Sequence, residues 1–460
     1  MTRGWAGARD VAMTTPAHRD RYVDFLRALS ITAVVVGHWL AVTIVMDDGR
    51  IQGRHVLEVL PAVHVLTWVF QVIGVFFLVG GYANAASWTA AQRAGAGYGE
   101  WLTTRSTRLL APTTVFIAVG ATAAAAARAT GIDLEMVRVG AWLIAISLWF
   151  LAIYLVVVAL TPIMLAAHYR WGLRTVLALA VAVAVGDAVR LTTGEASAGA
   201  ANFVLVWLIA HQFGFAWWDG TLTRTRWRPW GLFAVGLTAL LAGTTAGPYP
   251  VSMVAYPGAP LQNTSPPTLA LLVLIVTQTG LVLLWARPIR RLLARMSVWT
   301  AVVAINGVIM TLFLWHMVPV VIAASALYPT GIMPDLDVGS AGWFAFRPLW
   351  VISCGVSLVV LVAAFGWAER VSTMALPAVP QRLWVTALAV CGTAGACAGI
   401  GLLTVTGLQG EGPSGIPVTA LATYVVGIAL LAAVWATGRG RRRHAALDAP
   451  GIAESTHTGR

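Results

Sequence analysis

The sequence predicts an all-α, polytopic transmembrane helical bundle, and three observations carry that prediction. Hydrophobic residues make up 58% of the 460-residue chain, whereas charged residues make up only 10%. An ordinary soluble protein has roughly 25% charged residues, so this chain has too few to cover a soluble surface of its size. The apolar residues are also grouped into continuous runs of about 20, the length that an α-helix needs to span a bilayer.

The same composition disfavours several other classes of protein. A nucleic-acid binder and a disordered chain would both carry far more charge. A secreted disulfide scaffold would carry more cysteine, whereas the three cysteines here, Cys354, Cys391 and Cys397, all fall inside apolar runs. Strands of a transmembrane β-barrel would be alternating segments of about 10 residues, and these runs are continuous. Helices are therefore the expected spanning elements, and we expect neither a nucleic-acid partner nor a metal site.

The apolar runs give about twelve candidate spans. The weakest two are the fifth, 174–190, and the seventh, 230–247. In order along the chain the candidates are 24–46, 61–88, 109–129, 141–165, 174–190, 200–217, 230–247, 268–285, 299–328, 346–368, 383–404 and 418–437.

The arginines orient these spans. All 30 basic residues are Arg, and they cluster in every second loop, as cytoplasmic loops of membrane proteins do. With the N-terminus inside, the outer side holds only Arg50, Arg54, Arg128, Arg138, Arg190 and Arg347. We therefore expect both termini to be cytoplasmic and the protein to be a multi-pass component of the cell (plasma or inner) membrane. Most of these arginines are sufficiently explained as topology signals.

Three ionisable residues lie in the first span, in the segment RYVDFLRALSITAVVVGHWL. Arg27 and His38 are 11 residues apart, which places them on one helix face roughly 16 Å apart along the axis. Asp24 precedes Arg27 by three residues and is positioned to neighbour it. An ionisable residue inside a span is a candidate functional residue. The residues alone support equally a snorkelling arginine and a histidine that only packs.

This segment resembles the first helix of the acyltransferase-3 family of integral membrane O-acyltransferases, in which an Arg is followed by ten residues and a His. Four further segments are similar to family segments in the same order along residues 20 to about 370. They are GVFFLVGGY (Gly74 to Tyr82), RSTRLLAP (Arg105 to Pro112), LWFLAIYL (Leu148 to Leu155) and FLWHMVPV (Phe313 to Val320).

The chain departs from the family pattern in a few places. Gly80 stands where the family usually has Ser, so a hydroxyl role there is lost. Val23 and Ala28 replace the common Leu and Gly, which matters less. The family core usually has about ten helices, so the last two spans look like an addition, and the acceptor cannot be carried over from relatives.

The resemblance implies transfer of an acyl group, acetyl by default, from cytoplasmic acyl-CoA to a hydroxyl of an acceptor at or beyond the membrane. Within that function His38 is the expected general base, because histidine titrates in the right range. Arg27 and Asp24 are grouped with it. Arg105 and Arg108, together with Arg27, are expected to hold the phosphates of CoA, because arginine offers paired donors to phosphate.

Two further residues are expected to help bind the acceptor, namely His316 and Trp149. No permanently bound cofactor is expected, since acyl-CoA serves as a co-substrate. The expected partners are acyl-CoA, the lipid bilayer, and a carbohydrate, lipid or small-molecule acceptor. The sequence does not choose among these acceptors.

Two other functions stay open. Twelve helices with a basic cytoplasmic face also fit a transporter or flippase of lipid-linked or small-molecule substrates, although we see none of the internal symmetry that transporters often have. A lipid-linked glycosyltransferase would require a metal-binding acidic pair, and Asp47 and Asp48 lie next to each other in the first outer loop.

The expected organisation has four parts. Residues 1–23 form a cytoplasmic N-terminal segment, 24–370 form the acyltransferase transmembrane core, 371–437 add two helices, and 438–460 form a basic cytoplasmic tail that we expect to be disordered. The N-terminal segment contains no short apolar core with a cleavage site, so we do not expect it to act as a secretory signal.

Overall fold

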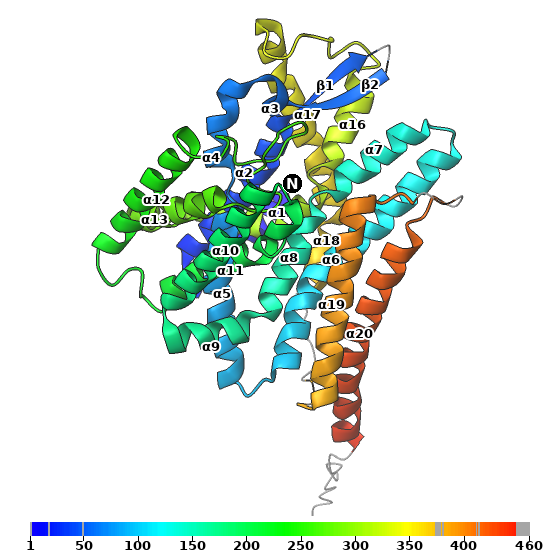
Figure 1. Ribbon diagram of the computed structural model, residues 1–460. Coiled ribbons are helices and arrows are strands. Elements are labelled where there is room, and N and C mark those ends of the chain that lie inside the picture. The colour runs from blue at the N-terminus through cyan, green and yellow to red at the C-terminus, as the bar shows by residue number, and fades with distance from the viewer. Residues whose placement is uncertain are drawn as a thin grey trace, which may run out of the picture.

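The chain folds as a bundle of helices in the computed structural model, which confirms the expected helical membrane architecture (Figure 1). The structure describes residues 2–16, 19–47, 50–372, 379, 381–410, 412 and 415–447. Of the helices in this part of the chain, ten are long and apolar enough to cross a membrane, or up to eleven if one bent pair is a single span. The predicted count of about twelve is therefore not confirmed.

The first half of the chain supplies ten α-helices, a hairpin and a short 3-10 helix. They are α1 (Thr2–Met13), α2 (Arg21–Ala41), β1 (Val42–Asp47), β2 (Arg50–His55), α3 (Val56–Val59), η1 (Pro61–Leu66), α4 (Thr67–Phe70), α5 (Ile73–Arg93), α6 (Tyr98–Ala129), α7 (Leu134–Ala145), α8 (Leu148–Ala159), α9 (Thr161–Trp171) and α10 (Arg174–Thr193).

The second half is helical in all its regular elements that the structure describes. They are η2 (Ala196–Gly199), α11 (Asn202–Trp218), α12 (Trp227–Thr245), α13 (Leu269–Leu292), α14 (Met296–Asn306), α15 (Ile309–Trp315), α16 (Val318–Leu327), α17 (Ala341–Phe365), α18 (Trp367–Ser372), α19 (Leu383–Thr406) and α20 (Val418–Leu447). The seventh predicted span corresponds to α12, which is a helix but is not among the ten apolar enough to span.

The hairpin corrects the all-α prediction. The first helix ends at Ala41, and Val42–Asp47 pairs antiparallel with Arg50–His55, with Val42 opposite His55 and Asp47 opposite Arg50. The segment Val42–Asp47 is rich in β-branched residues, which favour strands over helices. In Figure 1 the hairpin lies at the top of the molecule, beyond the end of α2.

Three predicted continuous spans are broken helices, and one of them is the fourth, which is divided among α7, α8 and α9. The second span is divided into η1, α4 and α5, with non-helical residues Gln71 and Val72 between α4 and α5. The ninth span is divided into α14, α15 and α16, and α14 and α15 are bent by 56°. Backbone that leaves the helix at membrane depth requires polar partners from the protein, so these breaks indicate where polar groups gather.

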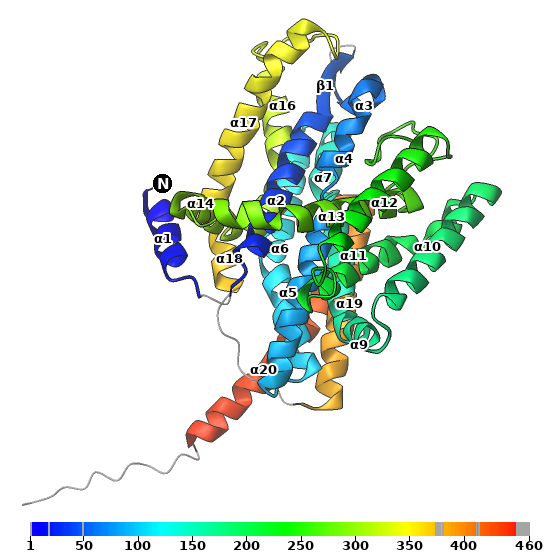
Figure 2. The same ribbon diagram turned by 90° about the vertical axis from the view of Figure 1, so that its left-hand side faces the viewer.

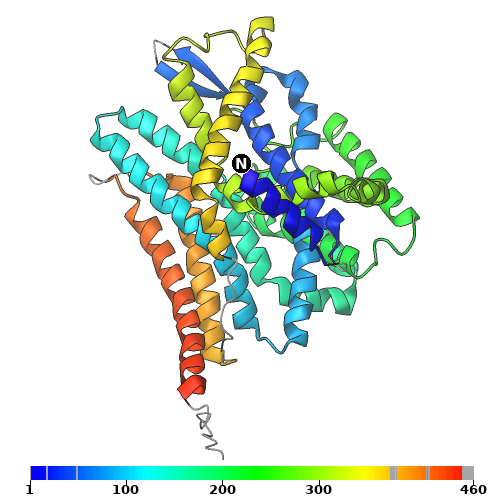
Figure 3. The same cartoon turned by 180° about the vertical axis from the view of Figure 1, so that it is seen from behind.

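The outer surface of α17 is apolar, as expected of a lipid-facing helix. Ile352, Val356 and Val360 recur every four residues and are each about 60% exposed, at 62%, 61% and 62%. Side chains at this spacing form one stripe along a helix. Figure 3 shows α17, in yellow, on the side of the bundle seen from behind.

The two C-terminal helices pack against each other and against the core. Added Cβ atoms at Gly399 and Gly427 would lie 2.5 Å from Tyr424 N and 2.3 Å from Ala396 N, so only glycine permits this close approach. The Trp435 indole donates to Thr107 Oγ1 at 3.0 Å, which ties α20 to α6. Figures 1 and 3 show α19 and α20 as a long pair beside α6. Helix α20 continues past the predicted span to Leu447.

The N-terminal segment contains a helix that we did not predict. Helix α1 lies beside α14 (Figure 2), with Ala12 buried and the Trp299 indole donating to Thr15 Oγ1 at 3.0 Å. The same view shows α2 near the centre of the bundle, where α5, α13, α14, α15 and α17 contact it. The helix with the predicted chemistry is therefore surrounded by the core.

Candidate functional site

Helix α2 places Asp24, Arg27 and His38 on one continuous element. Asp20 begins the helix, because its carboxylate accepts a hydrogen bond from Tyr22 N at 3.0 Å. At the other end His38 Nδ1 lies 2.8 Å from the carbonyl oxygen of Val34. Because a carbonyl only accepts, Nδ1 must carry the proton, which leaves the lone pair of Nε2 available as a base.

The structure brings His316 next to His38, with ring centroids 5.0 Å apart. His316 Nδ1 lies 2.7 Å from the carbonyl oxygen of Phe313, so Nδ1 again carries the proton. His316 Nε2 is buried and has no hydrogen-bond partner in the described part of the chain. Two imidazoles therefore meet with both Nε2 lone pairs unused by the backbone.

The two histidines are held together by the backbone around them. The Trp39 indole, next to His38, donates to the carbonyl oxygen of His316 at 2.7 Å. His316 lies at the break between α15 and α16, where that carbonyl has no helical partner within α15. The break thus supplies the acceptor that fixes α15 to α2.

Sequence reasoning missed Glu369, which lies in α18. Its carboxylate accepts hydrogen bonds of 3.2 Å from Met310 N, Thr311 N and Thr311 Oγ1 at the start of α15. Burial raises the pKa of this carboxyl, although these hydrogen bonds and the charge of Arg27 act in the opposite direction. Glu369 therefore caps the helix that carries His316. It escaped notice because it lies just beyond the tenth predicted span, where acidic residues are unremarkable.

Arg27 and Asp24 are less closely coupled than the i,i+3 spacing suggested. Their charged atoms are 4.0 Å apart, whereas Arg19 Nε lies 2.6 Å from the Asp24 carboxylate. Asp24 is therefore bound mainly by Arg19, and this hydrogen bond raises the pKa of Arg19. The side chain of Arg27 is 33% exposed, so it retains access to a ligand.

Arg105 and Arg108 lie within a helix and not before one, because α6 begins at Tyr98 and the third span was predicted to begin at 109. Arg108 is exposed, and Arg105 donates from Nη2 to Asn84 Oδ1 on α5. The charges of Arg27 and Arg108 both act on Arg105. The structure thus brings the three predicted arginines within electrostatic range of one another.

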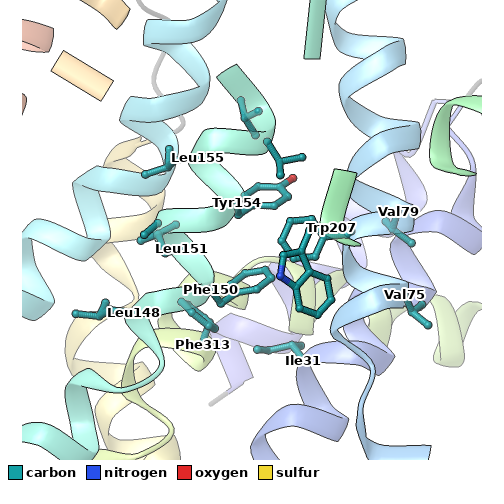
Figure 4. Packing of buried hydrophobic residues seen from close by; sticks show 14 of the residues in the cluster. Ile31, Val75, Val79, Leu148, Phe150, Leu151, Tyr154, Leu155, Trp207 and Phe313 are labelled. Carbon is teal, nitrogen blue, oxygen red and sulfur yellow. The ribbon is translucent and has the colours of Figure 1, made fainter. Parts of the chain in front are cut away.

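A cluster of aromatic side chains extends from Arg105 to His316, and Figure 4 shows its members Tyr154, Phe150, Phe313 and Trp207. The ring of Tyr154, which lies near Arg105, stacks on Phe150 with centroids 5.7 Å apart. The ring centroids of Phe150 and Phe313 are 5.3 Å apart, and those of Phe313 and His316 are 6.4 Å apart. Trp149 packs against Phe150 and Trp207 in this cluster, and its part in acceptor binding stays a prediction.

The structure also modifies the reading of Gly80, where we expected a hydroxyl role to be lost. A Cβ atom at Gly80 would lie 2.9 Å from Tyr154 Cε2 and 3.2 Å from the Tyr154 hydroxyl. The ring of Tyr154 therefore occupies the space that a larger residue at position 80 would need. A hydroxyl is present at this place after all, supplied by another helix.

Metal ligands do not gather anywhere in the described residues. There, no group of three or more His, Cys, Asp or Glu side chains is placed to hold an ion. Of the acidic pair that a glycosyltransferase would need, Asp48 lies outside the described residues.

One comparison with known proteins found a match. A family model described as an acyltransferase domain matches residues 20–367, a range that contains α2 through α17 and excludes α19 and α20. It contains every predicted site residue. Searches of curated proteins and of solved structures found no match.

Proposed function

The chain belongs to the acyltransferase-3 family, and from that premise we propose that it is a membrane-embedded O-acyltransferase that uses acyl-CoA. In this proposal the acyl group, acetyl by default, passes to a hydroxyl of a carbohydrate, lipid or small-molecule acceptor outside the cytoplasm. The observation that carries it is the meeting of His38 and His316 with both Nε2 atoms available, where His38 lies on the helix that also carries Arg27.

In the proposed reaction His38 Nε2 accepts the proton of the acceptor hydroxyl while its oxygen attacks the thioester carbonyl carbon. The C–O bond forms, the C–S bond breaks, and the CoA thiolate leaves. The imidazolium of His38 then returns its proton to that thiolate. The Nδ1 hydrogen bond to Val34 supports this role, because it keeps the ring in the one tautomer that can act as a base at Nε2.

His316 is proposed to orient the acceptor. Its Nε2 is a buried acceptor with no partner in the described part of the chain, and a second hydroxyl or the same hydroxyl in another rotamer would satisfy it. Leaving such a group unsatisfied costs about 1–3 kcal/mol, so a site of this kind favours ligands that can donate a hydrogen bond.

Arg27, Arg105 and Arg108 are proposed to bind the phosphates of CoA. Arginine is the preferred side chain for phosphate because its planar guanidinium donates two parallel hydrogen bonds. Three such groups from two helices would otherwise repel one another, and a polyanionic ligand removes that repulsion.

The first test of the proposal is whether the protein binds coenzyme A and transfers an acyl group from acetyl-CoA. Purified protein in detergent should show a higher unfolding temperature with coenzyme A, and membranes that contain it should transfer radiolabel from acetyl-CoA to a carbohydrate or lipid fraction. A transporter or flippase would show neither effect. Binding of CoA without transfer would contradict the proposed reaction but retain the proposed donor site.

The acceptor is then identified by mass. Envelope glycans, lipids and secreted metabolites from a strain that lacks the protein should differ from those of the parent strain by one acyl group on a single compound. No such difference in any of these fractions would contradict an extracytoplasmic acceptor.

A further inference from the structure

Arg105 is the end of a chain of three hydrogen-bonded side chains from three helices. Its Nη2 donates to Asn84 Oδ1 on α5, and Asn84 Nδ2 lies 3.0 Å from His211 Nε2 on α11. Asn84 and His211 are both 0% exposed. A buried hydrogen-bonded chain of this kind fixes the side chain at its end.

The direction of each hydrogen bond in this chain follows from chemistry. A guanidinium only donates, so the carbonyl oxygen of the Asn84 amide must face Arg105. The amide NH₂ then faces His211, so His211 Nε2 must accept, and the imidazole must be neutral. The three groups therefore interlock in one arrangement, and a flipped amide would place two donors against each other.

Close packing of α5 and α11 makes the hydrogen bond between Asn84 and His211 possible. A Cβ atom at Gly81 would lie 2.1 Å from the carbonyl oxygen of His211, and one at Gly214 would lie 2.2 Å from that of Leu78. Gly81 lies three residues before Asn84, and Gly214 lies three residues after His211. Each glycine is therefore about one turn away on the same face of its helix. They let the helices approach until the amide of Asn84 and the ring of His211 meet.

Most of the guanidinium of Arg105 remains available. Within the described part of the chain, its hydrogen bond to Asn84 is the only one we find. Arg108, one turn further along α6, is exposed, and its charge acts on Arg105. Arg105 thus has donors to spare for an anion while one of its nitrogens is anchored.

We propose that Asn84 and His211 are positioning residues that hold Arg105 ready for the phosphates of CoA. This inference rests on the proposed function and goes beyond it, because neither residue belongs to a segment that carries the family resemblance. An arginine side chain loses much rotamer freedom when a ligand immobilises it, and an anchor that is already formed removes that cost from binding.

The test is the affinity of the purified full-length protein for coenzyme A, measured by calorimetry. Asn84→Leu keeps the size of the side chain but removes both hydrogen bonds, and we expect it to weaken CoA binding about 10- to 30-fold. In turnover assays with acetyl-CoA, KM should rise while kcat changes little. Asn84→Asp should restore most of the affinity, because a carboxylate still accepts from Arg105 and His211 can then donate to it.

Asn202→Leu is the matched control. Asn202 is also buried on α11, and its amide donates to the carbonyl oxygens of Val183 and Pro267, away from Arg105. This variant should lower the unfolding temperature but leave the affinity for CoA unchanged. An equal loss of affinity in the control would show that the effect of Asn84→Leu is general destabilisation.

A second variant keeps the test decisive if Asn84→Leu does not fold. His211→Leu leaves the contact between Arg105 and Asn84 but removes the group that orients the amide, so affinity for CoA should fall several-fold. Wild-type affinity in whichever of the two variants folds would overturn the positioning role. Failure of the wild-type protein to bind CoA would instead overturn the proposed donor.

Discussion

The hydrogen bonds of individual side chains say more about the candidate site than the residue types alone. His38 was predictable from its place in the first span, but its tautomer follows only from the position of Val34. Arg105 was likewise predictable, whereas Asn84 and His211 are polar residues in apolar helices whose partner could not be inferred without knowing which helices touch. Contacts between distant segments are set by packing, which a single sequence does not show.

The space around Gly80 gives a prediction at this scale. Gly80→Ser would place a Cβ 2.9 Å from the Tyr154 ring, and the ring is packed between Phe76, Phe77 and Phe150. We expect the free energy of unfolding to fall by about 1–3 kcal/mol, as overpacking usually costs. Thermal unfolding in detergent measures this.

Gly401→Ser is the control for that substitution, because an added Cβ there meets nothing within 4 Å and Gly401 also lies in a spanning helix. Stability equal to that of the control would show that the Tyr154 ring can move aside at no cost.

His55 lies at the end of the hairpin, and we expect it to make stability depend on pH. Burial, together with the nearby His38 and His64, lowers its pKa to about 4. Between pH 4 and about 6.5 the unfolded chain then binds a proton that the folded protein does not, so stability should decrease as the pH falls through this window. Glu58, which accepts from His55 N, and Arg54, which pairs with Glu58, are the charged groups beside it.

The measurement compares unfolding temperatures at pH 7 and pH 5 for the wild-type protein and His55→Gln. The variant should lose less stability on acidification than the wild-type protein. An identical loss in both would assign the acid sensitivity to other groups.

At the scale of elements, the prediction succeeded where helices are continuous and failed where they break. Spans 174–190 and 383–404 agree closely with α10 and α19, because uninterrupted apolar runs have only one way to satisfy their backbone in a membrane. The breaks depend on distant caps, such as Gln278 Nε2, which donates to the carbonyl oxygens of Trp68 and Gln71 at 3.0 Å. Hydropathy alone does not reveal such caps.

The hairpin after α2 had a local signal that was not used. The dipeptide Asp48-Gly49 between two segments with β-branched residues is a common hairpin sequence. The high hydropathy of residues 42–46 extended the predicted helix through the first strand instead.

Arg347 fixes the end of the helix that carries His38, the proposed base. Its Nη2 donates to the carbonyl oxygens of Trp39, Leu40 and Val42 at 2.7–3.1 Å, and so caps the end of α2 that carries His38. This contact explains an arginine on the predicted outer side. Arg347→Met should cost about 2–3 kcal/mol of stability, because buried carbonyls lose a charged donor, and should lower turnover.

Thermal unfolding and label transfer from acetyl-CoA measure the two effects. Arg128→Met is the control, since Arg128 also lies on the predicted outer side and donates to a carbonyl, that of Gly412, but at an exposed position. If Arg347→Met matched the control in both stability and turnover, the capping role would be wrong.

At the scale of the whole molecule, the family domain and the added helices share one bundle. The matched range ends at residue 367, yet α19 and α20 pack along α6, the helix that carries Arg105 and Arg108. Their hydrogen bonds join the inner surface of the pair to that helix, as between Ser106 Oγ and Thr393 Oγ1 at 3.1 Å. The added pair is therefore placed to support the proposed donor site.

The orientation of the bundle remains a prediction from the arginine pattern, and cysteine labelling tests it. In a variant without the three native cysteines, Gly53→Cys in the hairpin should react with a membrane-impermeant maleimide on intact cells. Ala94→Cys, in the loop between α5 and α6, should react only after the membrane is permeabilised. The opposite pattern would place the arginine group outside and contradict a cytoplasmic donor.

The most direct test of the central claim is acyl transfer by His38→Ala. Loss of a general base lowers turnover about 10²- to 10⁴-fold, so the variant should transfer almost no label from acetyl-CoA while it still binds CoA with wild-type affinity. His64→Ala is the control histidine and should retain transfer. Wild-type turnover by folded His38→Ala would contradict the account, because the proposed reaction would then proceed without its base.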